Sequence, residues 1–208
     1  MAGNLPIQIG RQPDLPATSR RPAGWSDGPC RALISTAEPV RWVPVHGGGE
    51  IADLLWSSTP ISHAQVGWQD DRLPVSGLAW PTAVDLAMAL GGRLPTSAEW
   101  EWMAAGPQRR RFPWGDQPWE SSLANLRDSH HGMPLPVGSC PCGATPQGLL
   151  DVAGNVWEWT STTTPARGVV VRGGSYQSPD RYATCVYINE VPPFLRSPGI
   201  GVRVVREP

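Results

Sequence analysis

Two acidic side chains, Asp151 and Glu158, lie seven residues apart in the segment GLLDVAGNVWEWT at 148–160, with Gly154 and Asn155 between them. Carboxylates are hard oxygen ligands for a cation. Gly154 and Asn155 permit the tight turn that would aim backbone carbonyls at the same cation. The pattern is typical of calcium ligation. The same carboxylates could also cap and brace the turn without a metal, and both interpretations stay open.

A second set of side chains offers softer ligands. Thiols and imidazoles at Cys140, Cys142, Cys185, His130 and His131 could hold copper, iron or zinc if the fold brings them together. The two cysteines of the CPC segment have one residue between them, whereas strong zinc motifs have two or more. A metal site built from this set is therefore a hypothesis that depends on the fold.

Two segments that must position these groups are predicted to be helical. Residues 80–90 begin with Pro81 at a first helical position, carry a broad apolar face and stop at a Gly-Gly pair. Residues 96–105 begin with the Ser/Thr-x-x-Glu pattern of a capping box, in which Thr96 and Glu99 satisfy each other's backbone amides. Short strands are expected within 33–45, before the glycines at 47–49, and around 169–174 and 199–205.

Several charged residues are expected to form buried pairs. Glu99 and Glu101 diverge around the helix, so we expect one of them to be buried and paired, with Arg93 as a candidate partner. Arg172 and Arg203 lie on predicted strands and are expected to satisfy buried carboxylates. A structural role is favoured over an acid/base role for these groups.

Composition predicts an α+β domain with little regular secondary structure. The 208 residues include 11 Trp, 23 Gly and 24 Pro but only 2 Phe and 3 Tyr, which indicates turns and irregular coil pinned by indole rings. Residues 1–30 are rich in Pro, Gly, Arg and Ser and are interpreted as a loosely ordered arm, with a single domain at 31–208.

Charge and targeting signals argue against several classes of partner. A net charge of −1 gives no footprint for nucleic acid or an anionic membrane, and the Arg109–Arg111 run is interpreted as a solvated loop. No apolar stretch suits a signal peptide or a membrane span. We expect a cytoplasmic location with reduced thiols.

Four strings, GGRLPTSAEWEWMAAG, FPWGD, GLLDVAGNVWEWT and VVRGGSY, stand in the order and near the intervals of one family. The chain resembles the formylglycine-generating enzymes, or sulfatase-modifying factors, and their paralogues in ergothioneine biosynthesis. The resemblance covers residues 54–205 and implies a C-type-lectin-like core.

The resemblance also implies two calcium sites. The first would use two side chains and two backbone carbonyls, those of Asp151, Glu158, Gly154 and Val156. Asp151 stands where the best-known members have an Asn, which keeps the ligand and adds charge. The second would use Asn125 and the carbonyl of Leu126, with Asp128 as a weak replacement for a further ligand.

At the expected active site, this sequence departs from the family's pattern. The enzymes bind copper(I) through a cysteine pair just after RGGS, but here those positions fall on Ser178 and Ala183, and Cys185 lies two residues late. Ser175 matches the serine that lines the family's pocket, or it could bond its own turn. Ser175, Ser178 and Cys185 are the candidate catalytic residues, with copper or iron as the candidate redox metal.

Three functional hypotheses follow. The first is an oxidoreductase of this family with an altered site, acting on a peptide or small molecule. The second is a non-catalytic module that displays residues 177–197 to a ligand or protein partner, as in retroelement-diversified proteins. The third is a subunit that completes another chain's site, since the helical domain that carries the iron ligands of the ergothioneine paralogues is absent.

Overall fold

The computed structural model describes residues 38–67 and 71–208, so the predicted arm at 1–30 lies outside the described residues. Three helices occur in this part of the chain, α1 (His63–Val66), α2 (Trp80–Ala89) and α3 (Ser97–Ala105). Short 3-10 turns lie at η3 (Arg127–Ser129), η4 (Pro141–Gly143) and η5 (Asp180–Ala183). The strands are β1 (Trp42–Val45), β2 (Leu54–Ser57), β3 (Trp157–Thr163), β4 (Val169–Arg172), β5 (Asn189–Val191), β6 (Ile200–Gly201) and β7 (Val205–Arg206).

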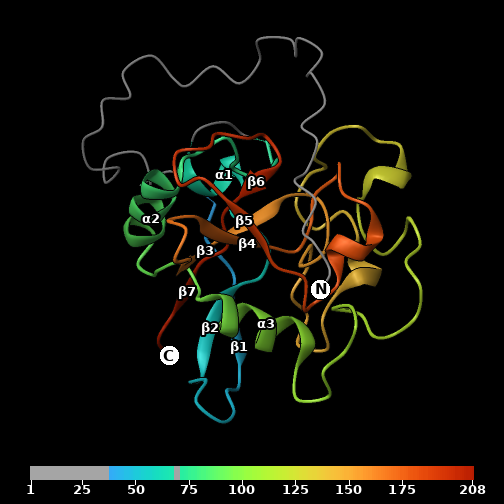
Figure 1. Ribbon diagram of the computed structural model, residues 1–208, viewed down its shortest axis with the longest axis horizontal. Coiled ribbons are helices and arrows are strands. Elements are labelled where there is room, and N and C mark those ends of the chain that lie inside the picture. Colours follow the sequence, from blue (N-terminus) through green and yellow to red (C-terminus); the bar gives the residue numbers. More distant parts are fainter. Residues whose placement is uncertain (1–37, 68–70) are drawn as a thin grey trace.

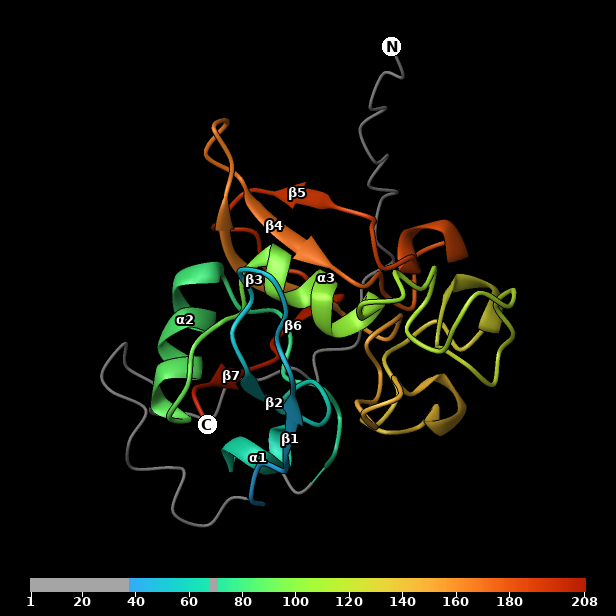
Figure 2. The same cartoon turned by 90° about the horizontal axis from the view of Figure 1, so that it is seen from below.

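The strands form two small sheets, ordered β1-β2-β7 and β5-β4-β3-β6. Neighbours are antiparallel except β3 and β6, which run parallel. Figures 1 and 2 show α2 on one side of the sheets and the long irregular segment at 106–150 on the other. The chain therefore has the α+β character expected from its composition.

Helix α2 confirms the first helical prediction. Proline stands in its first turn, where its missing N–H is unneeded, and Ala83, Leu86 and Ala87 form the buried face. This face packs against β3. The helix stops at Leu90, and Gly91 has a φ of +78°, a conformation that suits glycine.

Helix α3 confirms the second prediction together with its capping box. The hydroxyl of Thr96 accepts from the Glu99 amide, and the Glu99 carboxylate accepts from the Thr96 amide. Both carboxylate oxygens of Glu99 also accept from Arg93, each at 2.8 Å. Arg93 is thus the partner that the sequence suggested.

Indole rings anchor the irregular segments to the core. Trp100 and Trp159 are fully buried in two neighbouring apolar clusters. The indole N–H of Trp159 donates to the carbonyl of Leu78 at 3.1 Å, and that of Trp100 to Glu158 at 2.6 Å. The first bond joins residues that are 81 positions apart in the sequence, and the second joins residues that are 58 apart. The tryptophans thus supply long-range contacts within the chain.

Two expectations about strands need correction. Arg203 lies between β6 and β7 rather than on a strand. The WEWT sequence, interpreted above only as part of a metal loop, forms the first four residues of β3, the longest strand described. Residues 157–160 alternate apolar and polar side chains, which was the available strand signal. All four are buried, because Glu158 and Thr160 find hydrogen-bond partners inside the protein.

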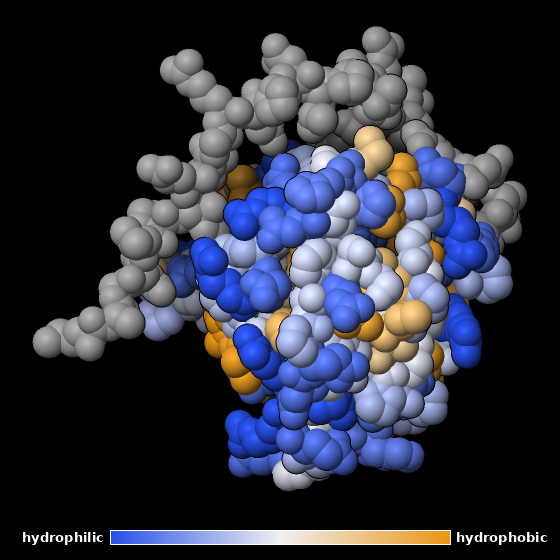
Figure 3. Space-filling view, turned by 90° about the vertical axis from the view of Figure 1, so that its right-hand side faces the viewer, coloured by the Kyte–Doolittle hydropathy of each residue, from blue (hydrophilic) through white to orange (hydrophobic). Residues whose placement is uncertain are grey.

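The described part of the chain holds no helix of the length and apolar character needed to cross a membrane. The loop-rich face in Figure 3 is mostly hydrophilic, and its apolar residues occur in small separated patches. Within residues 186–194, three large apolar side chains are exposed to solvent. The exposed fractions are 62% for Val186, 55% for Ile188 and 76% for Phe194.

Candidate functional site

The loop at 151–156 makes the tight turn that its glycine and asparagine predicted. Asp151, Gly154 and Asn155 have positive φ values of 51°, 76° and 61°. A side chain on Gly154 would place its Cβ 2.6 Å from the carbonyl oxygen of Asn125, so only glycine allows this approach. The turn therefore brings the two segments that carry the predicted calcium ligands against each other.

Asn155 joins these segments through its side chain. Its Oδ1 accepts from the amide of Leu135 at 2.8 Å and from the side-chain amide of Asn125 at 3.1 Å. Its Nδ2 donates to the Leu135 carbonyl at 3.0 Å. Sequence reasoning gave Asn155 a backbone role only and missed this one; an amide side chain in a left-handed turn was the available signal.

The side-chain amide of Asn125 is only partly satisfied by hydrogen bonds. Its Nδ2 donates to Met133 and Asn155, whereas its Oδ1 is buried and has no hydrogen-bond partner among the described residues. A buried amide oxygen without a partner is costly unless something else satisfies it. A hard cation would do so, because amide oxygens are calcium ligands.

The two predicted acidic ligands are buried and already partnered in part. Glu158 accepts from Arg203 at 2.8 Å through Oε1 and from Trp100 through Oε2. Asp151 accepts from the amide of Gly138. Burial raises the pKa of both carboxyls against the pull of Arg203.

Some of the predicted calcium ligands are available to a cation, and others are already engaged. The orphan oxygen of Asn125 and the carboxylate of Asp151 suit a hard cation, whereas both oxygens of Glu158 are engaged by side chains. The carbonyl of Leu126 already accepts from the amide of Ser129. Asp128 pairs with Arg127 on the surface at 3.2 Å.

The buried arginines satisfy carboxylates, as the sequence predicted. Arg203 donates to Glu158 and also to the carbonyls of Ser57 and Leu150. Arg172 donates to Glu101 at 2.7 Å. A buried charge needs such a partner, because an unpaired one is strongly destabilising.

The turn that follows β4 brings two of the candidate catalytic residues together. Ser175 and Ser178 are buried, and their hydroxyl oxygens lie 3.4 Å apart. The Ser175 amide donates to the Ser178 hydroxyl at 3.0 Å, and the amide of Gln177 donates to the Ser175 hydroxyl at 3.3 Å. Both serines therefore bond their own turn, one of the two roles foreseen for Ser175.

The structure places Cys185 elsewhere. It is fully buried in the apolar cluster around Trp100, and burial raises the pKa of its thiol to about 12. Ala183 lies against the turn, with its Cα 3.5 Å from a Cβ built on Gly174. Ala183, which the resemblance aligns with the second copper-binding cysteine, is thus next to the serine turn but carries only a methyl group.

The thiols and imidazoles that could have formed a soft-metal site do not come together in the described residues. Cys140 is buried, with its thiol pKa raised to about 11 by burial and by the charge of Asp151, whereas Cys142 is exposed. Within 38–67 and 71–208, no three His, Cys, Asp or Glu side chains gather closely enough to hold a metal ion. Cys30 lies outside these residues.

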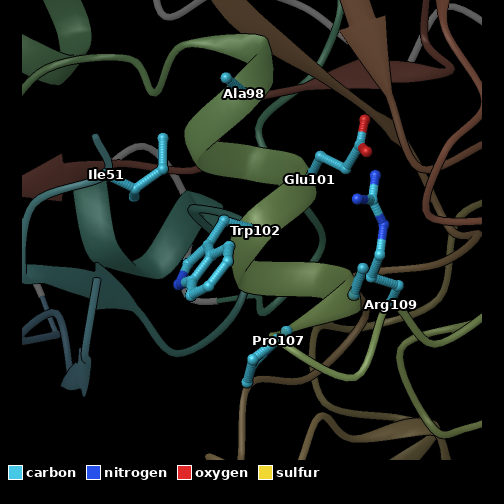
Figure 4. Close-up of a pocket in the computed structure, with 8 residues that line it drawn as sticks. Ile51, Ala98, Glu101, Trp102, Pro107 and Arg109 are labelled. Atoms are coloured by element: carbon cyan, nitrogen blue, oxygen red, sulfur yellow. The ribbon is translucent and has the colours of Figure 1, made fainter. Parts of the chain in front are cut away.

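A cavity of about 370 Å³ lies on the outer face of α3, where no motif predicted one. Figure 4 shows Trp102 and Ile51 along it and Glu101 facing Arg109 at one end. The helical spacing of Ala98, Glu101 and Ala105 was the one available signal, because residues three or four apart share a face.

Comparison with known proteins places this geometry in context. A model of the sulfatase-modifying factor enzyme 1-like domain matches residues 34–208. The chain is 36% identical over 132 residues to a hercynine oxygenase of Mycolicibacterium smegmatis, covering 60% of this chain and 30% of that protein. It is 41% identical over 102 residues to a formylglycine-generating enzyme of Mycobacterium tuberculosis, covering 43% and 33%.

The matched segments span about a third of the length of these two curated relatives. Among solved structures, Treponema denticola variable protein 1 superposes with a TM-score of 0.64 at 18% identity, covering 83% of this chain and 93% of that one. A likeness at this identity shows the shared fold alone.

Proposed function

Because the chain belongs to the family of sulfatase-modifying factor enzyme 1-like domains, we propose that it is an oxidoreductase with an altered active site that acts on a peptide or small molecule. The names of the two curated relatives, an oxygenase and a formylglycine-generating enzyme, support oxidative chemistry. The observation that carries the altered site is the pair of hydroxyls, Ser175 and Ser178, in the turn after β4.

The chemistry of this turn differs from that of a thiolate pair. Serine hydroxyls can orient a substrate by hydrogen bonding, but neither a hydroxyl nor the methyl of Ala183 is a ligand for copper(I). A copper or iron ion remains part of the proposal as the group that would activate oxygen. Its ligands would then be groups other than the side chains of Ser178 and Ala183.

Restoring the thiols tests the altered site directly. We expect the Ser178→Cys/Ala183→Cys variant, purified anaerobically and loaded with copper(I), to retain about one copper per chain. Wild type and a single Ser178→Cys variant are the matched controls and are expected to retain less. A double variant that binds no more copper than wild type would show that these positions do not form the family's metal site.

Oxygen consumption tests the activity itself. Wild type, loaded with copper(I) or iron(II), should consume oxygen with a cysteine-containing peptide or a small thiol. If it retains no redox metal and consumes no oxygen with such substrates, the oxidoreductase proposal fails.

Calcium is proposed as a structural ion of the same scaffold. The Asp151 carboxylate would hold the first ion, together with the carbonyls of Gly154 and Val156 and, after rearrangement, Glu158. Asn125 Oδ1 would help to hold a second ion, next to the carbonyl of Leu126. The charge of the first ion would offset the excess of negative charge among the buried groups, since Asp151 and Glu158 share one arginine, Arg203.

A second candidate function is a non-catalytic binding module. It is favoured by the three apolar side chains exposed in residues 186–194, within the segment that carried the copper ligands in the resemblance. A reverse transcriptase gene and a template repeat of residues 177–197 beside this gene would support it. Oxygen consumption by the metal-loaded protein would favour the enzyme instead.

A further inference from the structure

We propose that the cavity on α3 binds a free amino acid with a large apolar side chain, at a site separate from the Ser175–Ser178 turn. None of the residues that line the cavity belongs to that turn. Its volume of about 370 Å³ lies at the small end of the ~300–1,000 Å³ typical of ligand pockets. This size suits a single small molecule better than a length of peptide.

One wall of the cavity is apolar and held rigidly. The indole N–H of Trp102 donates to the carbonyl of His46 at 3.0 Å. The loop before β2 lies so close to this ring that a Cβ on Gly48 would be 2.5 Å from it. Ile51 comes from the same loop and faces the cavity in Figure 4. A fixed aromatic wall binds an apolar side chain with little loss of conformational entropy.

The polar end offers groups of both charges. Figure 4 shows the guanidinium of Arg109 pointing toward the carboxylate of Glu101, yet no ion pair joins these two described residues. Glu101 is held in place by Arg172, which donates to Oε2 at 2.7 Å. Its Oε1 has no hydrogen-bond partner among residues 38–67 and 71–208, nor has the guanidinium of Arg109.

An amino acid matches these groups. Its carboxylate would accept from the guanidinium of Arg109, a geometry that arginine favours, and its ammonium would donate to Glu101 Oε1. Two arginines and one glutamate surround this end, so the net charge is positive and the carboxylate is the more important of the two ligand charges. The apolar side chain would then lie along Trp102 and Ile51.

Titration calorimetry of the full chain with L-phenylalanine tests the proposal. We expect saturable binding, weakened by about tenfold or more in Arg109→Gln, because a charge-assisted pair is lost. Ala98→Phe should abolish binding, since Ala98 is an exposed helical position whose new ring would fill the cavity. Arg167→Gln is the matched control and should bind as wild type does. It too replaces an exposed arginine of positive φ, outside the cavity.

Two altered ligands separate the charges. L-Phenylalanine amide, which lacks the carboxylate, should bind at least about tenfold more weakly and lose more affinity than N-acetyl-L-phenylalanine, which lacks the ammonium. The absence of saturable binding to wild type, or equal binding by wild type and Arg109→Gln, would overturn the proposal. Neither readout requires a redox metal, so the outcome is independent of the oxidoreductase proposal.

Discussion

The substitution Glu99→Gln tests how the start of α3 is stabilised. The carboxylate of Glu99 accepts two hydrogen bonds from Arg93 at 2.8 Å and one from the amide of Thr96 at 2.7 Å. Glutamine keeps the shape but has one acceptor oxygen and no charge, so at least one bond to Arg93 is lost. Hydrogen bonds to charged groups are worth ~1.5–3 kcal/mol, and Arg93 is partly exposed, so we expect a loss of about 1–2 kcal/mol at neutral pH.

The pKa of Glu99 makes this loss depend on pH. Burial acts to raise the pKa, but the hydrogen bonds from Arg93 and Thr96 outweigh it, and the pKa lies below its ordinary value of 4.5. The unfolded chain therefore takes up this proton at a higher pH than the folded chain. The contribution of Glu99 is complete above pH 4.5 and is lost as the pH falls through the folded-state pKa.

Urea unfolding followed by tryptophan fluorescence measures the effect. The difference in free energy of unfolding between wild type and Glu99→Gln should be constant from about pH 7 to pH 5 and shrink below about pH 4.5. The melting temperature should fall by about 2–8 °C at pH 7. Glu120→Gln, at an exposed glutamate, is the control and should change stability by less than about 0.5 kcal/mol. A difference that is absent at pH 7, or unchanged at pH 4, would refute the reasoning.

Two further predictions concern the thiols and calcium. Cys142 should react with a disulfide reagent in the folded protein, whereas Cys185 should react only after unfolding, because it is fully buried with its thiol pKa raised to about 12; peptide mapping after alkylation distinguishes the two. Chelation should lower the melting temperature by about 5–10 °C if calcium had been present at ~100 times its dissociation constant, and added calcium should restore it. An Asn125→Ala variant should show a smaller response to both, and an unchanged response would argue against this residue as a ligand.

The sequence predicted the helices better than the strands because the helical signals are local. The proline in the first turn of α2 and the Thr96–Glu99 capping box of α3 each act within one turn of the chain. Strands β2 and β3 were missed because their register depends on partners far along the sequence, such as Val205 opposite Trp56 and Ile200 opposite Trp157. Strand β2 also lacks alternation of polar and apolar residues, since Leu54, Leu55 and Trp56 are all apolar.

The candidate site was predictable in its residue types but not in its pairings. Asp151 and Glu158 were recognisable as oxygen ligands, but the engagement of Glu158 by Trp100 and Arg203 spans 58 and 45 residues. The α3 cavity shows the same limit. Glu101 and Trp102 lie on a helix that the sequence identified, whereas nothing local indicated that Ile51, from a different loop, completes the wall.

The hydrogen bonds of Arg172 and of the serine turn hold the backbone on either side of the proposed altered site. Arg172 donates to the carbonyls of Cys185 and Tyr187, and so holds the segment just after Ser178 and Ala183. The serine turn is closed by its own hydrogen bonds. Side-chain and backbone bonds therefore hold both ends of the segment that contains Ser178 and Ala183. Cysteines introduced at Ser178 and Ala183 would enter a backbone that is already in place, which is why their copper binding reports on geometry rather than on folding.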